Sequence, residues 1–192
     1  MKHWRERLHD DLEPKLACDD PRPAISAYHD MPYAIFHYPP ADEFEVRKEI
    51  SLLRIRLEQK GKRVHVVSLA NCLQDAWNKA GIAPQQLIAA EKKVGIGATI
   101  DTLHSILDSR CPLDALVIGQ LPAELDPLRD IVFITRAGAL YPFYRTSALL
   151  EQLKGQLAAP GVLFYPGGLD GPAGLKFMDI LEAEHNYRPR IY

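Results

Sequence analysis

The chain has 192 residues, of which 47% are hydrophobic and 25% are charged, and its formal net charge is −2. These values are typical of a globular protein with a single domain. A protein that binds DNA chiefly through its phosphates carries a clear excess of basic residues. The composition therefore argues against strong nucleic-acid binding by the isolated chain.

No targeting or membrane segment is expected. The N-terminus lacks the apolar core of a signal peptide. The longest stretch free of Lys, Arg, Asp and Glu is 155–169, which is shorter than a membrane helix and contains two prolines and four glycines. We expect a cytoplasmic protein that does not contact a membrane.

The first part of the chain predicts a helical arm. Apolar residues recur every four positions over 3–18, and Pro14 inside this pattern predicts a kink or break. Pro21, Pro23 and Pro32 follow in a stretch that we interpret as a linker. We therefore divide the chain into an arm with linker, 1–30, and an α/β domain, 31–192.

The α/β domain begins with a βαβ unit. Residues 33–38 and 64–69 are predicted strands, and a helix of about 18 residues lies between them, ending near Gly61. Asp42, with Glu45 three residues later, has the spacing of a helix cap. A helix that connects two strands in this way implies that the strands are parallel.

Helices dominate the middle of the chain. We predict one over 73–80, a second between Pro84 and Gly95, and a third over 100–107. Periodicity does not decide whether 113–125 is helix or strand. These segments form a helical insertion between two βαβ halves.

A second βαβ unit follows the insertion. Residues 131–135 and 161–165 are predicted strands, with a helix from about Thr146 between them, and 190–192 is a candidate edge strand. The fold class is α/β: a single domain with a mostly parallel four- to five-stranded sheet flanked by helices.

The segments that follow the strands are the candidate site, because ligands of open parallel sheets bind beyond the carboxyl ends of the strands. The segment 135–147 holds two arginines beside a predicted helix start, and the glycine-rich segment 166–174 is interpreted as a shaped turn that carries one acid, Asp170. We expect these side chains to lie close together at one edge of the sheet. The candidate binding residues are Arg136, Tyr141, Tyr144, Arg145, Thr146 and Asp170.

Three interpretations of these residues stay open. Arg136, Arg145 and the amides near Thr146 could form an anion or carboxylate pocket. The tyrosines could instead pack into the core while the arginines pair with nearby acids. Tyr and Arg are also the side chains enriched at protein-binding hot spots.

No motif for catalysis, metal or cofactor binding is present. The sequence has no GxxxxGK[ST] or GxGxxG fingerprint, no HExxH, no CxxC and no GxSxG elbow. We therefore predict a protein that is not an enzyme, with no catalytic residues, no metal and no cofactor.

Several long runs resemble the BrxB family, small components of BREX phage-defence systems. They are 131–150, 160–167 and the closing 187–192, with 33–57 as a further similar segment. The resemblance implies a role beside a phosphatase-like protein, PglZ, a DNA methyltransferase and a large ATPase. It supplies no catalytic residues.

Two functions follow as hypotheses. The first is a non-catalytic adaptor that docks a PglZ-like protein, with other BREX components as further possible partners. The alternative is a nucleotide- or anion-binding α/β protein related to P-loop proteins but without the Walker A motif. In that case the turn 38–40 would occupy the position of the phosphate loop.

Overall fold

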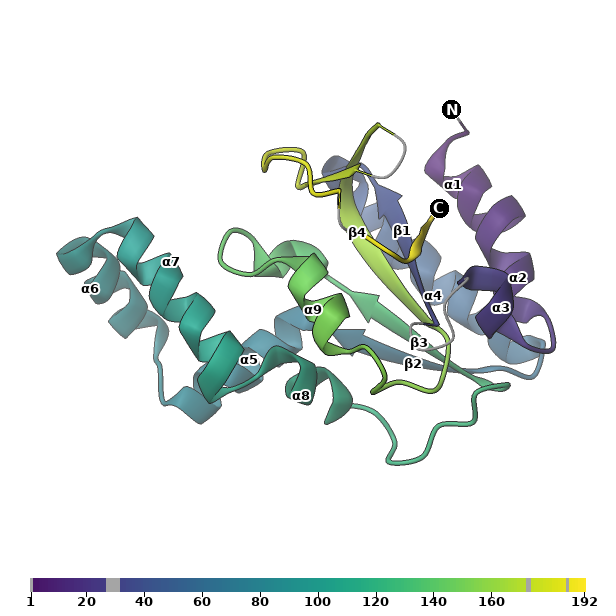
Figure 1. Cartoon of the computed structure of the whole chain (residues 1–192), viewed down its shortest axis with the longest axis horizontal. Coiled ribbons are helices and arrows are strands. Elements are labelled where there is room, and N and C mark those ends of the chain that lie inside the picture. The colour runs from purple at the N-terminus through teal and green to yellow at the C-terminus, as the bar shows by residue number, and fades with distance from the viewer. Residues whose placement is uncertain (1, 27–31, 172–173, 186) are drawn as a thin grey trace.

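A mostly parallel sheet forms the centre of the molecule (Figure 1). The computed structural model describes residues 2–26, 32–171, 174–185 and 187–192. The strand order is β2-β3-β4-β1-β6, every pairing along this path is parallel, and β5 pairs antiparallel with the end of β4. The strands are β1 (Tyr33–Tyr38), β2 (Arg63–Ser68), β3 (Asp130–Thr135), β4 (Gly161–Asp170), β5 (Gly174–Phe177) and β6 (Arg190–Ile191). The predicted fold class is confirmed.

Helices cover both faces of this sheet (Figure 1). The N-terminal arm comprises α1 (Trp4–Glu6), the π-helical turn η1 (Arg7–Leu12), α2 (Glu13–Ala17) and α3 (Pro21–Ile25). The remaining helical elements are the 3-10 turn η2 (Pro40–Asp42), α4 (Glu43–Gln59), α5 (Leu69–Ala80), α6 (Pro84–Val94), α7 (Ile96–Ser105), the π-helical turn η3 (Ile106–Arg110), α8 (Leu113–Ile118), the 3-10 turn η4 (Ala137–Leu140) and α9 (Thr146–Gln152). No helix within the described ranges is long and apolar enough to cross a membrane.

The alternation of side chains along the strands creates two hydrophobic cores. In β1, Phe36 packs with α4 and the arm, whereas Ile35 packs with α5, α8 and α9 on the other face. In β3, Phe133 and Ile134 divide in the same way. The helices that follow β1 and β3 therefore lie on opposite faces, which places an opening at the strand ends between them.

The arm is more helical than the sequence predicts. Pro14 lies in the first turn of α2, and the preceding helix is π-helical over η1, which accommodates the missing proline N–H. The predicted linker is wrong at its start, because Pro21 opens the short helix α3 and the Asp20 side chain accepts a hydrogen bond from the N–H of Arg22. Residues 27–31, including the rest of that linker, lie outside the described residues.

Asp42 does not cap α4. The 3-10 turn η2 runs directly into α4, so the backbone of Asp42 is already turned (φ −90°, ψ 5°) and its side chain makes no capping bond. Its carboxylate instead accepts a hydrogen bond from the indole N–H of Trp4 at 2.8 Å. The side chain that suggested a helix start therefore fastens the arm.

The interpretation of 166–174 as a turn is also wrong. β4 continues to Asp170 and pairs with β5 as a hairpin. Gly167 makes the pairing possible, since a Cβ there would lie 2.0 Å from the carbonyl oxygen of Lys176.

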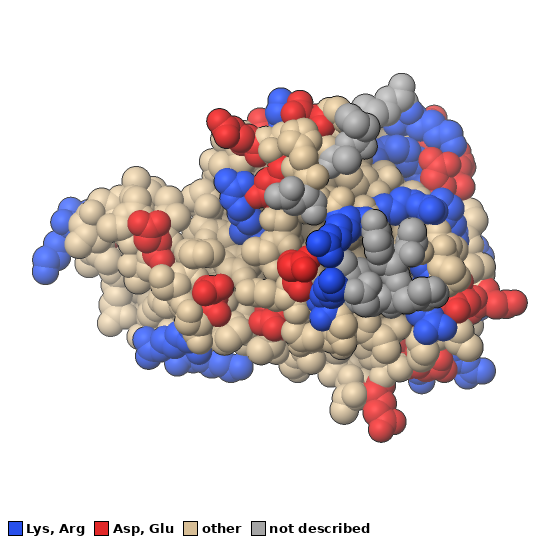
Figure 2. Space-filling model, viewed as in Figure 1, with Lys and Arg blue, Asp and Glu red and all other residues tan. Residues whose placement is uncertain are grey.

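The helical insertion projects from the body of the molecule (Figure 1). α6 and α7 pack side by side, and the ambiguous segment resolves into the buried helix α8. No residue of α6 is buried, and Ile88, Val94 and Ile96 are exposed. The projecting end carries mostly uncharged side chains on the face shown in Figure 2.

Candidate functional site

Three strand ends meet in a crevice at the carboxyl edge of the sheet. Its lining includes Pro40 after β1, Arg136 after β3 and Pro166 of β4, with Arg47 of α4 opposite. These segments were expected to converge, and the parallel registers of β1, β3 and β4 bring them to one edge.

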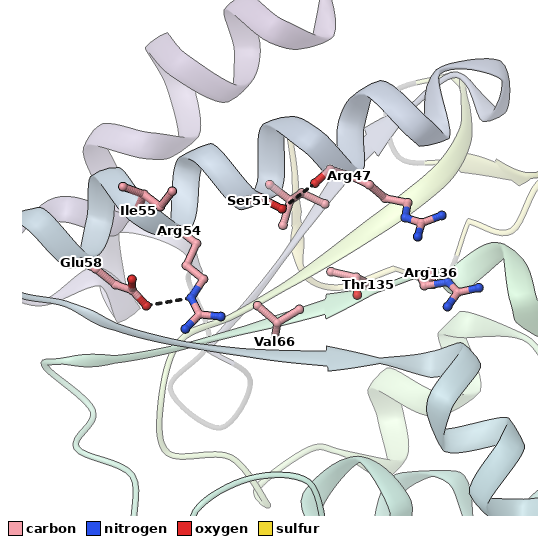
Figure 3. Close-up of a pocket in the computed structure, with 9 residues that line it drawn as sticks. Arg47, Ser51, Arg54, Ile55, Glu58, Val66, Thr135 and Arg136 are labelled. Atoms are coloured by element: carbon pink, nitrogen blue, oxygen red, sulfur yellow. Dashed lines mark hydrogen bonds and ion pairs between the residues drawn. The ribbon is translucent and has the colours of Figure 1, made fainter.

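The crevice adjoins an open groove of about 480 Å³ between α4 and the edge strand β2 (Figure 3). α4 covers the centre of the sheet but leaves Val66 of β2 43% exposed, although Val64 on the same face is buried. Ile50 and Ile55 of α4 and the end of β3 complete the apolar wall. The groove therefore exposes an apolar surface that the chain itself leaves uncovered.

Three arginines line this groove. The guanidinium groups of Arg47 and Arg136 extend in the same direction from α4 and from the end of β3 (Figure 3). Arg54 pairs with Glu58 at 2.7 Å. Among the described residues, Arg47 and Arg136 have no ion pair or side-chain hydrogen bond, and the Arg47 guanidinium lies over the Phe44 ring, 5.6 Å from its centroid. Two cationic groups thus remain available at one end of the groove.

The backbone of Arg136 has an unusual conformation. Its φ of 59° and ψ of 38° lie in the left-handed region, which side chains other than Gly, Asn and Asp rarely adopt. The turn directs the chain from β3 into η4, and its side chain is exposed. Strained residues of this kind cluster at functional sites, so the conformation supports a functional role for Arg136.

Arg145, by contrast, lines a different hollow and pairs internally. Its guanidinium bonds to the carboxylate of Glu184, and Ser147, His185 and Tyr187 line the same hollow. Burial raises the pKa of Glu184, but hydrogen bonds from Ser147, Arg145 and Tyr187 outweigh that effect and lower it below its usual value. The structure therefore places Arg136 and Arg145 at separate hollows.

The other predicted site residues make contacts within the chain, around η4, α9 and the β4–β5 hairpin. Tyr144 is buried and donates to Gln152 Oε1 at 2.7 Å, and the Thr146 hydroxyl lies 3.0 Å from that of Tyr187. The Tyr141 ring packs 6.2 Å from the ring of Phe177. Asp170 stands on the hairpin, where Lys176 Nζ lies 3.4 Å and His185 Nε2 lies 3.8 Å from its carboxylate.

Sequence reasoning found Arg136 but missed Arg47 and Val66. Arg47 looks like any exposed charge on an amphipathic helix, and Val66 like any valine of a buried strand. Their role depends on where α4 crosses the sheet, for which the sequence has no local signal. Among the described residues, no group of three or more His, Cys, Asp or Glu side chains is arranged to hold a metal ion.

Most of the chain matches one known protein family. The family model for the BREX protein BrxB matches residues 65–191. This chain belongs to the BrxB family. A BREX protein BrxB of Bacillus cereus (strain H3081.97) is 27% identical over 190 residues, which cover 98% of this chain and 96% of that relative. No solved structure matches significantly. The chain is therefore a component of a BREX phage-defence system.

Proposed function

We propose that this BrxB-family chain is a non-catalytic adaptor that docks a PglZ-like protein through the groove between α4 and β2. The observation that carries the proposal is the open apolar wall around Val66, flanked by the unpaired guanidinium groups of Arg47 and Arg136. Arg is enriched among the residues that dominate binding energy at protein interfaces.

Charge decides which kind of segment the groove accepts. Arg47, Arg54 and Arg136 face it with Glu58 as the one acid among its lining residues, and Glu58 already pairs with Arg54. A segment that places apolar side chains on Val66 and carboxylates against Arg47 and Arg136 satisfies both parts of the surface. The partner surface is accordingly expected to be apolar with acidic residues at one end.

A binding role also accords with the chemistry of the site. Among the residues that the structure describes, the groove offers arginines, a serine and a threonine, with no His or Cys and no acid free to serve as a general base. We therefore propose that the chain has no phosphatase, nuclease or ATPase activity of its own. Turnover that survives purification and disappears on one substitution in this chain would contradict this.

The anion-binding alternative has one observation in its favour. Arg47 and Arg136 both reach the crevice at the strand ends, where nucleotides bind in related architectures. However, Glu43 also lines the crevice, and the remaining lining includes Pro40, Pro166 and Met178. A carboxylate among apolar side chains opposes a phosphate there, so protein docking is the better supported function.

Co-expression with the PglZ-like protein of the same operon tests the proposal. Arg47→Glu and Arg136→Asn should each weaken the complex at least thirtyfold, about 2 kcal/mol, because the partner's carboxylates lose their cation. Asn is used because it tolerates the left-handed backbone at that position. Affinity is measured by titration of the purified proteins.

Lys48→Glu is the matched control. Lys48 neighbours Arg47 on α4 and is exposed, but it does not line the groove. Wild-type affinity in all three variants would exclude the groove as the docking surface. If Lys48→Glu weakens the complex equally, the loss of affinity is due to the overall charge of α4 and not to the groove. The methyltransferase and the large ATPase are titrated in parallel, because they are the other candidate partners.

A further inference from the structure

Another hollow, of about 520 Å³, lies beside β1 and β6, at the side of the sheet away from β2. The arm contributes Arg7, Asp11 and Lys15, the end of β1 contributes His37, and β6 with the residue after it contributes Arg190 and Tyr192. Neither the groove nor the crevice shares a lining residue with this hollow.

Three cations and one acid, Asp11, line this hollow. Within the described parts of the chain, Arg7, Lys15 and Arg190 make no ion pair, and their hydrogen bonds go to neutral oxygens: the His37 carbonyl, the Tyr192 hydroxyl and the Ala24 carbonyl. Other arginines of the arm are paired, Arg5 with Glu45 and Arg22 with Asp20. The missing partners are therefore a property of this hollow.

Arg7 shows most clearly that hydrogen-bond partners are missing in this hollow. Its Nη2 donates to the His37 carbonyl at 2.8 Å and its guanidinium lies over the Phe36 ring, but Nε and Nη1 are shielded from water and have no hydrogen bond. A shielded guanidinium that is hydrogen-bonded to no carboxylate is costly, because the ring compensates only part of the lost hydration. The positive charge of Arg7 thus stabilises any anion that enters the hollow.

The one acid of the lining does not remove this charge. Asp11 attracts Arg7 electrostatically, but its hydrogen bond, at 3.0 Å, comes from Lys2 Nζ, which lies outside the hollow. The His37 Nδ1 donates to the Gly167 carbonyl at 3.2 Å. Burial and the charge of Arg7 lower the pKa of this histidine to about 4, so its ring is neutral at pH 7. Among the described lining residues, three cations therefore face one acid, and the balance is positive.

We infer that this hollow binds the dianionic phosphate group of a small molecule, either inorganic phosphate or a phosphate monoester. Arg and Lys are the side chains that recognise phosphate, and a dianion matches three unpaired cations better than a carboxylate or a phosphodiester does. The site lies at the carboxyl ends of β1 and β6, where parallel sheets bind ligands. The inference is independent of the docking function of the groove.

Calorimetric titration of the full chain at pH 8 tests this site, with inorganic phosphate and adenosine monophosphate as probes at constant ionic strength. We expect saturable binding of both probes, and the tighter of the two shows whether a free or an esterified phosphate is preferred. Lys15→Gln and Arg190→Gln should each weaken binding at least tenfold. Lys48→Gln and Arg129→Gln remove the same charge from exposed positions outside the hollow and should not change it.

Arg7→Gln gives a second readout. If Arg7 serves the ligand, this variant loses phosphate binding but keeps or raises its melting temperature in phosphate-free buffer, since an uncompensated charge is removed. A lower melting temperature with unchanged phosphate binding would assign Arg7 to the structure alone and overturn the inference. It is overturned as well by an absence of saturable binding, by equal weakening in the control variants, or by equal affinity for a phosphodiester oligonucleotide without a terminal phosphate.

Discussion

The indole N–H of Trp4 donates a 2.8 Å hydrogen bond to the carboxylate of Asp42, joining residues that are 38 positions apart. Trp4 is 3% exposed and lies at the start of the arm, whereas Asp42 directly precedes α4. Leu8 and Leu12 continue the contact by packing into the core under α4. This bond therefore fixes the outer end of the arm against the helix that forms one wall of the groove.

Asp42→Ala should loosen this end of the arm. A hydrogen bond to a charged acceptor contributes about 1.5–3 kcal/mol, so we expect a loss of about 2 kcal/mol in the free energy of unfolding. Asp42→Asn keeps an oxygen that can accept the indole proton and should recover part of that loss. Urea unfolding measures the effect, and equal stability of the alanine variant and the wild type would show that the bond contributes nothing.

Asp130 is predicted to make the fold sensitive to acid. Its carboxylate is 2% exposed at the start of β3 and accepts bonds from Arg63 at 2.7 and 2.8 Å, from His65 at 2.9 Å and from the N–H of Asp126 at 2.6 Å. Burial raises the pKa of Asp130, but these hydrogen bonds outweigh it and lower the pKa below its usual value.

A carboxyl whose pKa is lower in the folded state stabilises the fold above its unfolded pKa, and this stabilisation disappears as the pH falls through the folded pKa. We therefore expect the contribution of Asp130 to be constant at neutral pH and to be lost below about pH 4. Asp130→Asn should cost about 2 kcal/mol at pH 7, because the neutral amide loses the ionic hydrogen bonds from Arg63 and His65. The variant should also show a flatter fall in stability between pH 5 and pH 2. An equally steep fall in both proteins would assign the acid sensitivity to other carboxyls.

Arg136→Gly should separate stability from function. Glycine adopts the left-handed backbone at this position without strain, so the variant should be as stable as the wild type or more stable by up to about 1 kcal/mol. Arg136→Val retains the strain and adds a branched Cβ, so it should melt at a lower temperature. Both variants lack the guanidinium and should lose phage defence in a plaque assay. Full defence with glycine would show that the side chain of Arg136 is not needed.

The sheet can be predicted from the sequence more completely than the candidate site can. Continuous apolar runs mark β1, β3 and the first half of β4, because each has two buried faces. The apolar residues of β2 mark a strand as well, although its burial is only partial. The second half of β4 is not recognisable as a strand in the sequence, because Pro166, Gly167 and Gly168 are typical of a turn. Gly167 is there for a close approach of β5 instead, and that approach exists only once the hairpin has formed.

The two arginines of 135–147 show that prediction from the sequence is limited in the same way at the candidate site. Both follow β3 and look equivalent in the sequence, yet the chain reverses at η4 between them. Arg136 faces the groove on the α4 side, whereas Arg145 immediately precedes α9 on the other side and meets Glu184. The position of Glu184 depends on residues 174–185 folding back over α9, which no local pattern predicts.

Arg145→Ala is expected to act through stability before it acts on binding. The Arg145 side chain is 54% exposed and that of Glu184 is 17% exposed, so the pair contributes at most about 1 kcal/mol. Its loss leaves Glu184 with the hydroxyls of Ser147 and Tyr187 and weakens the connection between α9 and the C-terminal segment. We therefore expect a melting temperature lower by a few degrees. Phage defence should persist at temperatures where the variant is folded.

A melting curve beside a plaque assay decides between the two roles of this arginine. Glu184→Gln is the matched variant, because it removes the negative partner and keeps Arg145 free to bind elsewhere. If the pair is structural, both variants lose similar stability and both retain defence below their melting temperatures. If Arg145 is itself a docking residue, Arg145→Ala abolishes defence while folded, and Glu184→Gln does not. That second outcome would add the α9 side of the molecule to the docking surface and contradict the assignment of docking to the groove alone.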